Sequence, residues 1–279
     1  MKGDQSRLPS ETAARLALLR EDLAARDRLA VAFSGGVDSS MLLTAAASVK
    51  GLEVIAVTAV SEFLAGRELK LAGALAEELG VRHVVTEFDP LGHPEIRKNP
   101  LDRCYYCKAA TYRTCLDAVA RHGFTTMADG TIADDAADFR PGRRAATELG
   151  VISPLADSGM TKADVRVLSR EIFGLKGWNR QSGACLASRF PPGTAISAGA
   201  LARVEQLENA LLDLGLDVVR ARYFGNTARI ETSAEGLERL ADATVRQAAV
   251  DAGIGAGFSV VAVDPEPYRP GRLNGEAAL

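Results

Sequence analysis

Residues 28–49, RLAVAFSGGVDSSMLLTAAASV, contain the clearest fold signal in the chain. A short apolar run, Arg28–Phe33, leads into Ser34-Gly35-Gly36-Val37-Asp38-Ser39-Ser40, and a helical pattern follows over Ser39–Val49. A strand that runs directly into such a loop and a helix brings the loop amides and the positive end of the helix to one point. The two glycines let the backbone approach an anion closely, and the serine hydroxyls add donors. The stretch therefore predicts a phosphate site.

Two other interpretations of the loop need weighing. A Gly-Gly pair by itself also fits a tight strand-to-helix turn with a Ser or Asp cap. The motif contains no lysine, so it is not the Walker loop that grips a pair of β- and γ-phosphates. The seven-residue run Ser34–Ser40, lying between a predicted strand and a predicted helix, favours phosphate binding over a plain turn.

The alternation of strand and helix continues on both sides of the loop. Leu16, Leu19 and Leu23 recur at helical spacing after Ser10-Glu11 and predict a leading amphipathic helix. Apolar runs that are each followed by a helix indicate a parallel sheet covered on both faces. We expect further strands at 52–60, 83–88 and 125–129, and helices at 67–79, 105–121, 142–149 and from Thr161, capped by that residue with Asp164, to about Gly174.

The last third of the chain has a different pattern. Residues 178–199 are rich in Gly, Pro and Ser and are typical of a linker, although this linker holds a cysteine and can belong to an active site. A small α+β domain is expected at 200–279, for substrate binding or oligomerisation, after a first domain at 1–177. Its predicted elements are helices at 200–214 and 235–252 and strands at 218–224, 228–232 and 258–263, with a loosely held tail after Pro265.

Composition limits the classes of partner. The chain has 279 residues, 47% hydrophobic and 25% charged, with a formal net charge of -3, so it has no general excess of basic charge for a nucleic acid. The first thirty residues mix charges with short apolar steps, and no apolar run reaches the roughly 18 residues that a membrane span requires. We therefore expect a cytoplasmic protein whose four cysteines are thiols, metal ligands or redox centres.

Three of the cysteines form a candidate site. Cys104-Tyr105-Tyr106-Cys107 is a CxxC at the entry to a helix, where the helix dipole favours thiolates. With Cys185 it can hold a 4Fe-4S cluster by three irons and leave the fourth iron open. Half a zinc site, a redox dithiol or unrelated buried thiols also fit the spacing, although the three histidines show no paired spacing. Cys115, in the same predicted helix, is expected to be a small buried residue.

The loop Ser34–Ser40 resembles the PP-loop of ATP pyrophosphatases, the superfamily of GMP synthetase, NAD synthetase and tRNA thiolation enzymes. These enzymes release pyrophosphate from ATP and leave AMP on a substrate oxygen. The resemblance implies a Rossmann-like α/β fold, ATP bound at the loop, and Asp38 as a ligand of Mg²⁺ near the leaving pyrophosphate.

Motifs along nearly the whole chain are similar to those of one family in this superfamily, the LarE sulfur transferases. The matching stretches are Ser34–Ser40, Asn99–Lys108 (NPLDRCYYCK), Asp129-Gly130-Thr131 with Asp134 and Asp135, Asp138–Arg143 (DFRPGR), Ser153-Pro154-Leu155, Ala184–Phe190 (ACLASRF) and Val219–Glu231 (VRARYFGNTARIE). Together these stretches are specific.

The resemblance implies conversion of the carboxylates of pyridinium-3,5-biscarboxylic acid mononucleotide to thiocarboxylates, for the nickel-pincer cofactor of lactate racemase, with AMP as the leaving group. In one branch of the family a single cysteine, at the position of Cys185, surrenders its own sulfur. In the other branch three cysteines, at the positions of Cys104, Cys107 and Cys185, bind a 4Fe-4S cluster that delivers sulfide. This chain has all three, so we expect the cluster-dependent branch. The resemblance also implies that this chain forms a homo-oligomer.

Five further residues are candidates for contacts with the substrate. Arg220 and Arg222 lie two apart on a predicted strand and so share a face, where they can clamp a phosphate or carboxylate, or simply face solvent. Glu231 on the partner strand can orient them, hold a metal or form a surface salt bridge, and we count it with Cys185 and Asp38 as a catalytic candidate. Ser188 and Arg189 beside Cys185 contact substrate or only shape a turn. Glu208 resembles an active-site position but also fits a solvated helix face.

Two departures from the family pattern affect local contacts. Ile132 stands where many relatives have Asn, and Trp178-Asn179-Arg180-Gln181 differs from a common Trp-Asp-Lys-Pro. Two other functions stay open. A tRNA thiolation enzyme would share the loop and the cysteines but should show a basic surface, whereas a nucleotide sensor would need the loop and not the cysteines.

Overall fold

A computed structural model describes residues 8–136, 141–180, 183–269 and 271–273. Within these ranges the chain divides into two compact units. The first unit comprises 8–88 and 104–183, and the second comprises 89–103 and 184–273. The second unit thus includes 89–103, which the sequence placed inside 1–177. Compact units need not coincide with domains, so the predicted boundaries stay predictions.

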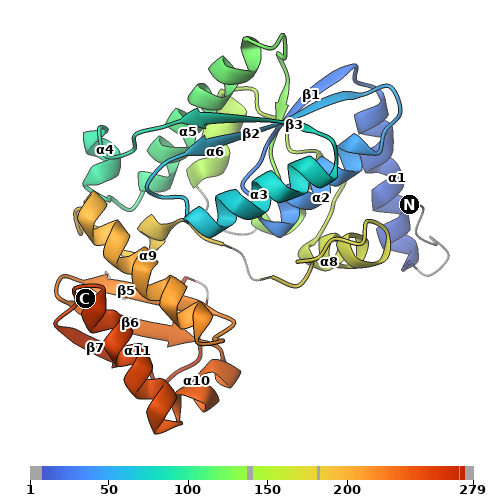
Figure 1. Cartoon of the computed structure of the whole chain (residues 1–279). Coiled ribbons are helices and arrows are strands. Elements are labelled where there is room, and N and C mark those ends of the chain that lie inside the picture. Colours follow the sequence, from blue (N-terminus) through green and yellow to red (C-terminus); the bar gives the residue numbers. More distant parts are fainter. Residues whose placement is uncertain (1–7, 137–140, 181–182, 270, 274–279) are drawn as a thin grey trace. The chain divides into compact units, whose positions relative to one another are not determined.

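The first unit is an α/β layer structure, as predicted. Its parallel sheet has the order β3-β2-β1-β4, and helices cover both faces (Figure 1). Leu29 and Val31 pack into the core on one face, whereas Ala30 between them packs into the core on the other, as the two-residue period of a strand requires. The elements are α1 (Ser10–Ala24), β1 (Arg28–Ala32), α2 (Val37–Ala47), β2 (Glu53–Val60), α3 (Gly66–Glu78), β3 (Arg82–Glu87), α5 (Arg103–Ala120), β4 (Met127–Ala128), η2 (Ala133–Ala136), α6 (Pro141–Glu148), α7 (Pro154–Asp157) and α8 (Lys162–Glu171).

The second unit contains a smaller mixed sheet in the order β5-β6-β7. β5 and β6 pair antiparallel, and β6 and β7 pair parallel. Its elements are α4 (Pro94–Arg97), η3 (Leu186–Arg189), α9 (Ala198–Asp213), β5 (Val219–Phe224), β6 (Thr227–Thr232), α10 (Ala234–Leu240), α11 (Ala243–Gly255) and β7 (Val260–Val263). This small α+β unit confirms the predicted fold class.

Local chemistry explains where the elements begin and where two predictions were wrong. The side chains of Thr161 and Asp164 form the predicted capping box at the start of α8. The single helix predicted over 235–252 is two helices, because the Asp242 carboxylate accepts from the Thr244 and Val245 amides and starts α11. The first residues after Pro265 are held, since the Tyr268 amide donates to the Thr232 carbonyl at 2.8 Å, whereas residues 274–279 of the predicted loose tail lie outside the described residues.

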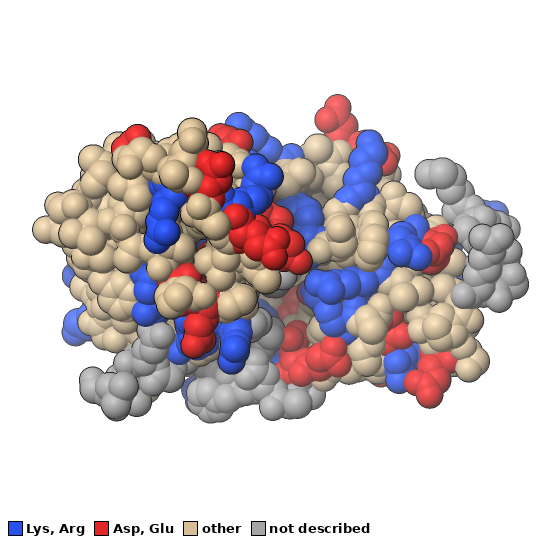
Figure 2. All heavy atoms as spheres, turned by 90° about the horizontal axis from the view of Figure 1, so that it is seen from below, with Lys and Arg blue, Asp and Glu red and all other residues tan. Residues whose placement is uncertain are grey.

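Figure 2 shows Lys and Arg side chains next to Asp and Glu side chains in several places on this face. None of the helices in the described ranges combines the length and the apolar character needed to cross a membrane.

Candidate active site

The glycine-rich loop lies between β1 and α2, and its own serines hold it in shape. The Ser39 hydroxyl donates to the Gly36 carbonyl at 3.1 Å and accepts from the Ser34 amide at 3.4 Å. Gly35 has a φ of +74°, and a Cβ there would lie 2.9 Å from the Glu68 carbonyl oxygen, so both conformation and space require glycine. Ser40 is buried in the first turn of α2. The predicted strand–loop–helix geometry is therefore present, with the start of α2 directed at the loop.

Asp38, in the first turn of α2, faces a lysine that the sequence did not single out. Lys162 Nζ lies 2.7 and 2.8 Å from the two Asp38 carboxylate oxygens. Lys162 is the first residue of α8, and its amide donates to Asp134 at 2.7 Å, which fixes the backbone from which this side chain extends. A cation is thus already positioned beside the carboxylate predicted to meet Mg²⁺.

Asp129, just past β4, is a second carboxylate near the loop, and unlike Asp38 it is buried. It accepts from Lys108 Nζ at 3.1 Å, from the Thr131 hydroxyl at 2.7 Å, and from Tyr112. Burial raises the pKa of Asp129, but the charge of Lys108 and the hydrogen bonds outweigh it, so the pKa is lowered and the group is ionised. A Cβ on the next residue, Gly130, would lie 2.8 Å from the Ser39 amide nitrogen. Asp129 therefore ties the end of β4 to α5, and the lack of a side chain at Gly130 lets this end pack closely against the start of α2.

The cysteines of the first unit differ in exposure. Cys104 and Cys107 lie one turn apart at the start of α5, and Cys104 is exposed while Cys107 is half-buried. Cys115 is buried, and burial raises the pKa of its thiol to about 12. It is the small core residue that was predicted. Cys104 and Cys107 are thus the more accessible thiols of the first unit, and Cys115 belongs to its core.

Cys185, in the second unit, precedes η3 and is exposed. Arg103 Nη1 donates to its Sγ at 3.6 Å. Crowding by neighbouring atoms raises the pKa of this thiol, but the charge and hydrogen bond of Arg103, the charge of Arg189 and the Ser188 amide outweigh it, so the pKa is lower than usual. The surroundings of Cys185 therefore favour a thiolate. Among the residues with described positions, no group of three or more His, Cys, Asp or Glu is arranged to hold a metal ion.

A buried ion pair between Arg189 and Glu208 stabilises the segment around Cys185. Arg189 is only 3% exposed and forms a two-bond pair with Glu208, with both distances 2.8 Å. It also donates to the Ala184 carbonyl at 2.7 Å and to the Ser188 hydroxyl at 2.9 Å. Glu208 further accepts from the Ala221 amide at 2.8 Å. The solvated-face interpretation of Glu208 is wrong, because this carboxylate ties Cys185's loop to β5 through Arg189.

Arg220 and Arg222 are both buried on β5, so the solvated-strand interpretation is also wrong. The ring of Tyr268 lies 5.1 Å from the Arg220 guanidinium carbon and 5.9 Å from that of Arg222. Arg222 donates to the Ser188 carbonyl at 2.9 Å. Burial and the positive charge of Arg189 lower the pKa of Arg220, which is the environment of a cation that an anionic ligand would stabilise.

Glu231 lies behind this pair of arginines and is completely buried. Its oxygens are 2.8 Å from Arg222, 3.2 Å from Arg229 and 3.1 Å from Arg272. The surface salt bridge considered for Glu231 is therefore a buried network. Because these three contacts all go to arginines, the Glu231 carboxylate is suited to orient Arg222.

The structure explains the two departures in part. Ile132 is buried in the core of the first unit, which suits an apolar side chain. Arg180 pairs with Glu68, and Trp178 is half-buried beside the loop. Gln181 and the motif residues Asp138, Phe139 and Arg140 lie outside the described residues.

Sequence reasoning assigned no role to Lys162, Lys108, Tyr112, Arg103 or Tyr268. Lys108 and Arg103 stand inside the quoted NPLDRCYYCK stretch, so the motif carried a signal for them. The other three carry no local signal, because their partners are distant in the chain.

Comparison with known proteins places the chain among relatives. The asparagine synthase family model matches residues 18–138. A pyridinium-3,5-bisthiocarboxylic acid mononucleotide synthase of Lactiplantibacillus plantarum is 38% identical over 249 residues, which cover 88% of this chain and 89% of the relative. An uncharacterized protein of Synechocystis sp. is 37% identical over 92% of this chain and 95% of its own length. An uncharacterized protein of Methanocaldococcus jannaschii is 28% identical over 73% of this chain and 77% of its own.

Proposed function

The chain belongs to the family of the pyridinium-3,5-bisthiocarboxylic acid mononucleotide synthase, and from this premise we propose that it converts the carboxylates of pyridinium-3,5-biscarboxylic acid mononucleotide to thiocarboxylates at the cost of ATP. It is an ATP-dependent sulfur transferase. The observation that carries the finer proposal is the Cys185 thiol, which Arg103 and Arg189 bias toward thiolate, in the same unit as the buried Arg220 and Arg222. One compact unit therefore contains both the arginines that suit an anionic substrate and the thiol that suits sulfur chemistry.

Activation is the first step. A carboxylate is a poor electrophile, so a carboxylate oxygen attacks the α-phosphorus of ATP, the bond to the pyrophosphate breaks, and an acyl adenylate forms. The loop amides and the serines of Ser34–Ser40 hold the polyphosphate at the start of α2. The hard oxygens of Asp38 suit Mg²⁺, which would offset negative charge on the leaving pyrophosphate. Lys162 is then free to turn from Asp38 toward the same negative charge.

Substrate anions are held in the second unit. Arg220 and Arg222 bind the phosphate or a carboxylate of the mononucleotide, because two guanidinium groups on one strand face match such oxygens. Glu231 keeps Arg222 in place, and Glu208 does the same for Arg189. Ser188 and Arg189 shape the backbone that presents Cys185. Glu231 and Glu208 act as positioning residues in this scheme.

Sulfur transfer is the second step. A sulfur nucleophile attacks the acyl carbon, and the bond to AMP breaks. We propose that Cys104, Cys107 and Cys185 hold a 4Fe-4S cluster, which when bound supplies an exchangeable sulfide. These three thiols suit the ligation of an iron-sulfur cluster, since two are exposed, the third is half-buried, and all lie in a loop or at the start of a helix. In the alternative, the Cys185 thiolate itself attacks, and later loss of its Cα proton breaks the Cβ–S bond to leave dehydroalanine.

Anaerobic purification with iron and sulfide analysis tests the source of sulfur. We expect iron and acid-labile sulfide in the wild type, loss of both in Cys104→Ala, and retention of both in the matched variant Cys115→Ala. If the wild type contains no iron and thiolates the substrate once per chain, the cluster mechanism is wrong and Cys185 is the sacrificial sulfur donor. If neither the wild type nor Cys115→Ala consumes ATP in the presence of the mononucleotide, the proposed substrate is wrong.

A further inference from the structure

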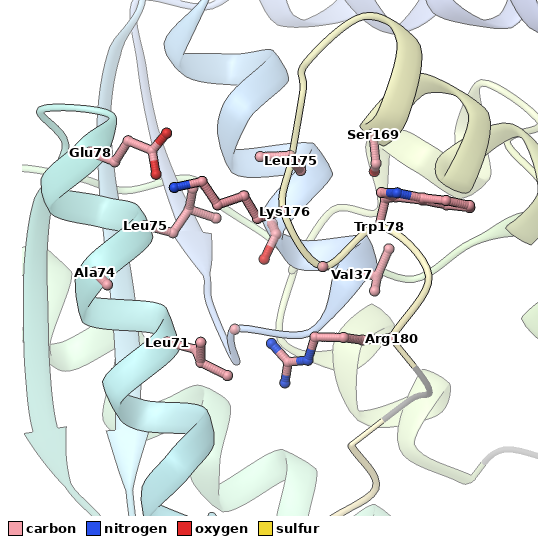
Figure 3. A pocket seen from close by; sticks show the side chains of 13 residues that line it. Val37, Leu71, Ala74, Leu75, Glu78, Ser169, Leu175, Lys176, Trp178 and Arg180 are labelled. Atoms are coloured by element: carbon pink, nitrogen blue, oxygen red, sulfur yellow. The ribbon is translucent and has the colours of Figure 1, made fainter. Parts of the chain in front are cut away.

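The first unit contains a pocket beside the glycine-rich loop, and its walls outside that loop have no part in the proposed chemistry. Its volume is about 240 Å³, and it lies between α3, the start of α2, and the segment that follows α8. Figure 3 shows Leu71, Ala74 and Leu75 along one side and Trp178 on the other, with Val37 beneath. Backbone of the glycine-rich loop at Gly35 and the side chain of Ser40 also line it.

One polar group in the pocket calls for a partner. Ser169, on α8, is fully buried, and its hydroxyl has no hydrogen-bond partner among the described residues. The Ser169 side chain points toward Trp178 in Figure 3. A buried hydroxyl without a partner is unfavourable, and native structures usually satisfy such a group with protein, water or a ligand. This hydroxyl therefore marks a place where a bound molecule can accept or donate one hydrogen bond.

The shape and charge of the pocket limit what it can hold. An engineered cavity of about 150 Å³ accommodates benzene, so 240 Å³ has room for two fused rings. The aliphatic side of α3 and the Trp178 ring form apolar walls that suit a flat ring. Charges near the pocket are balanced, because Arg180 pairs with Glu68 and Lys176 lies at the same end as Glu78. A ligand without net charge fits best.

We propose that this pocket is a binding site for a neutral, nitrogen-containing aromatic ring system, held between α3 and Trp178 and hydrogen-bonded to the Ser169 hydroxyl. Such a ligand contacts the loop at Gly35 and Ser40, so its occupancy is linked to nucleotide binding at that loop. The proposal does not depend on the sulfur source or on the mononucleotide substrate.

Trp178 makes the proposal directly testable, because it is the only tryptophan in the chain. Benzimidazole is titrated into the full-length protein while Trp178 fluorescence is followed, with and without saturating AMP. We expect a saturable change in fluorescence that persists with AMP. Absence of a saturable change, or its complete abolition by AMP, would overturn the proposal, because the ring would then bind nowhere near Trp178 or only in the nucleotide site.

Three variants complete the test. Ser169→Ala should weaken benzimidazole binding about fivefold, the loss of one neutral hydrogen bond, without lowering the thermal midpoint, since the hydroxyl removed has no partner in the described structure. Ser158→Ala is the matched control, because that buried hydroxyl donates to the Pro154 carbonyl, and it should lower the midpoint and leave binding unchanged. Ala74→Phe, at an exposed position of the wall, should fill the pocket and abolish binding. Unchanged affinity in both Ser169→Ala and Ala74→Phe would refute the site.

Discussion

Replacing Asp164 by Asn should destabilise the first unit by an amount that depends on pH. The Asp164 carboxylate accepts from Thr12 at 2.6 Å, from Arg15 at 2.7 Å and from Thr161, and so joins α1 to the start of α8. Burial raises its pKa, but these hydrogen bonds outweigh it and lower the pKa from 3.8 to about 2. A shift of one pKa unit corresponds to about 1.4 kcal/mol, so the carboxylate contributes about 2 kcal/mol at pH 7.

The sign of the pH dependence follows from the lowered pKa. At pH 7 the group is ionised in both the folded and the unfolded chain, and its full contribution is present. As the pH falls below 3.8 the unfolded chain takes up the proton first, and near pH 2 the folded chain does so as well. The contribution is therefore lost between about pH 4 and pH 2.

Urea unfolding followed by Trp178 fluorescence measures this effect, because Trp178 belongs to the same unit as Asp164. Asp164→Asn should unfold with a free energy about 2 kcal/mol below wild type at pH 7, and the gap should close toward pH 2. Asp22→Asn is the control, because Asp22 forms a partly exposed pair with Arg26 within one helix, and this change should cost no more than about 0.5 kcal/mol. A gap that stays constant from pH 7 to pH 2.5 would show that the charge of Asp164 is not what stabilises the unit.

Three other changes have defined outcomes. Lys162→Met should slow pyrophosphate release on the order of tenfold to a hundredfold. The free energy of unfolding should change by less than about 1 kcal/mol, because the ion pair of Lys162 with Asp38 is partly exposed. An unchanged rate would show that Lys162 has no part in the proposed step. Glu231→Gln should destabilise the second unit by about 3–5 kcal/mol, because it leaves three arginines around a neutral amide. Unfolding followed by circular dichroism measures this loss. Glu266→Gln, at an exposed position, should have little effect, and equal effects of the two changes would contradict the buried network. Iodoacetamide at pH 8 should modify Cys104 and Cys185 in the native protein and spare Cys115, whose thiol pKa is about 12, and mass spectrometry of the peptides would expose any labelling of Cys115.

Much of the first unit was predictable because its signals are local. The apolar run before Ser34, the paired glycines and the helical pattern after Asp38 lie within one stretch of chain, and each is a property of neighbouring residues. The capping box of Thr161 and Asp164 is local in the same sense. The helix predicted over 235–252 was wrong because an Asp at a helix start and an Asp on a helix surface look alike until the backbone around Asp242 is known.

The candidate site divides along the same line. The residue types of the site could be read from the chain alone: a glycine-rich loop, three cysteines in two motif stretches, and two arginines two apart on a strand. Only the tertiary structure decided their partners. Lys162 reaches Asp38 from 124 residues away, and Glu231 meets Arg272 from 41 residues away. Such pairs form when parallel strands and packed helices bring distant segments together, and spacing along the chain carries no record of that distance. Burial, which turned Glu208 and Glu231 from surface charges into supports for arginines, is likewise a property of the packed fold.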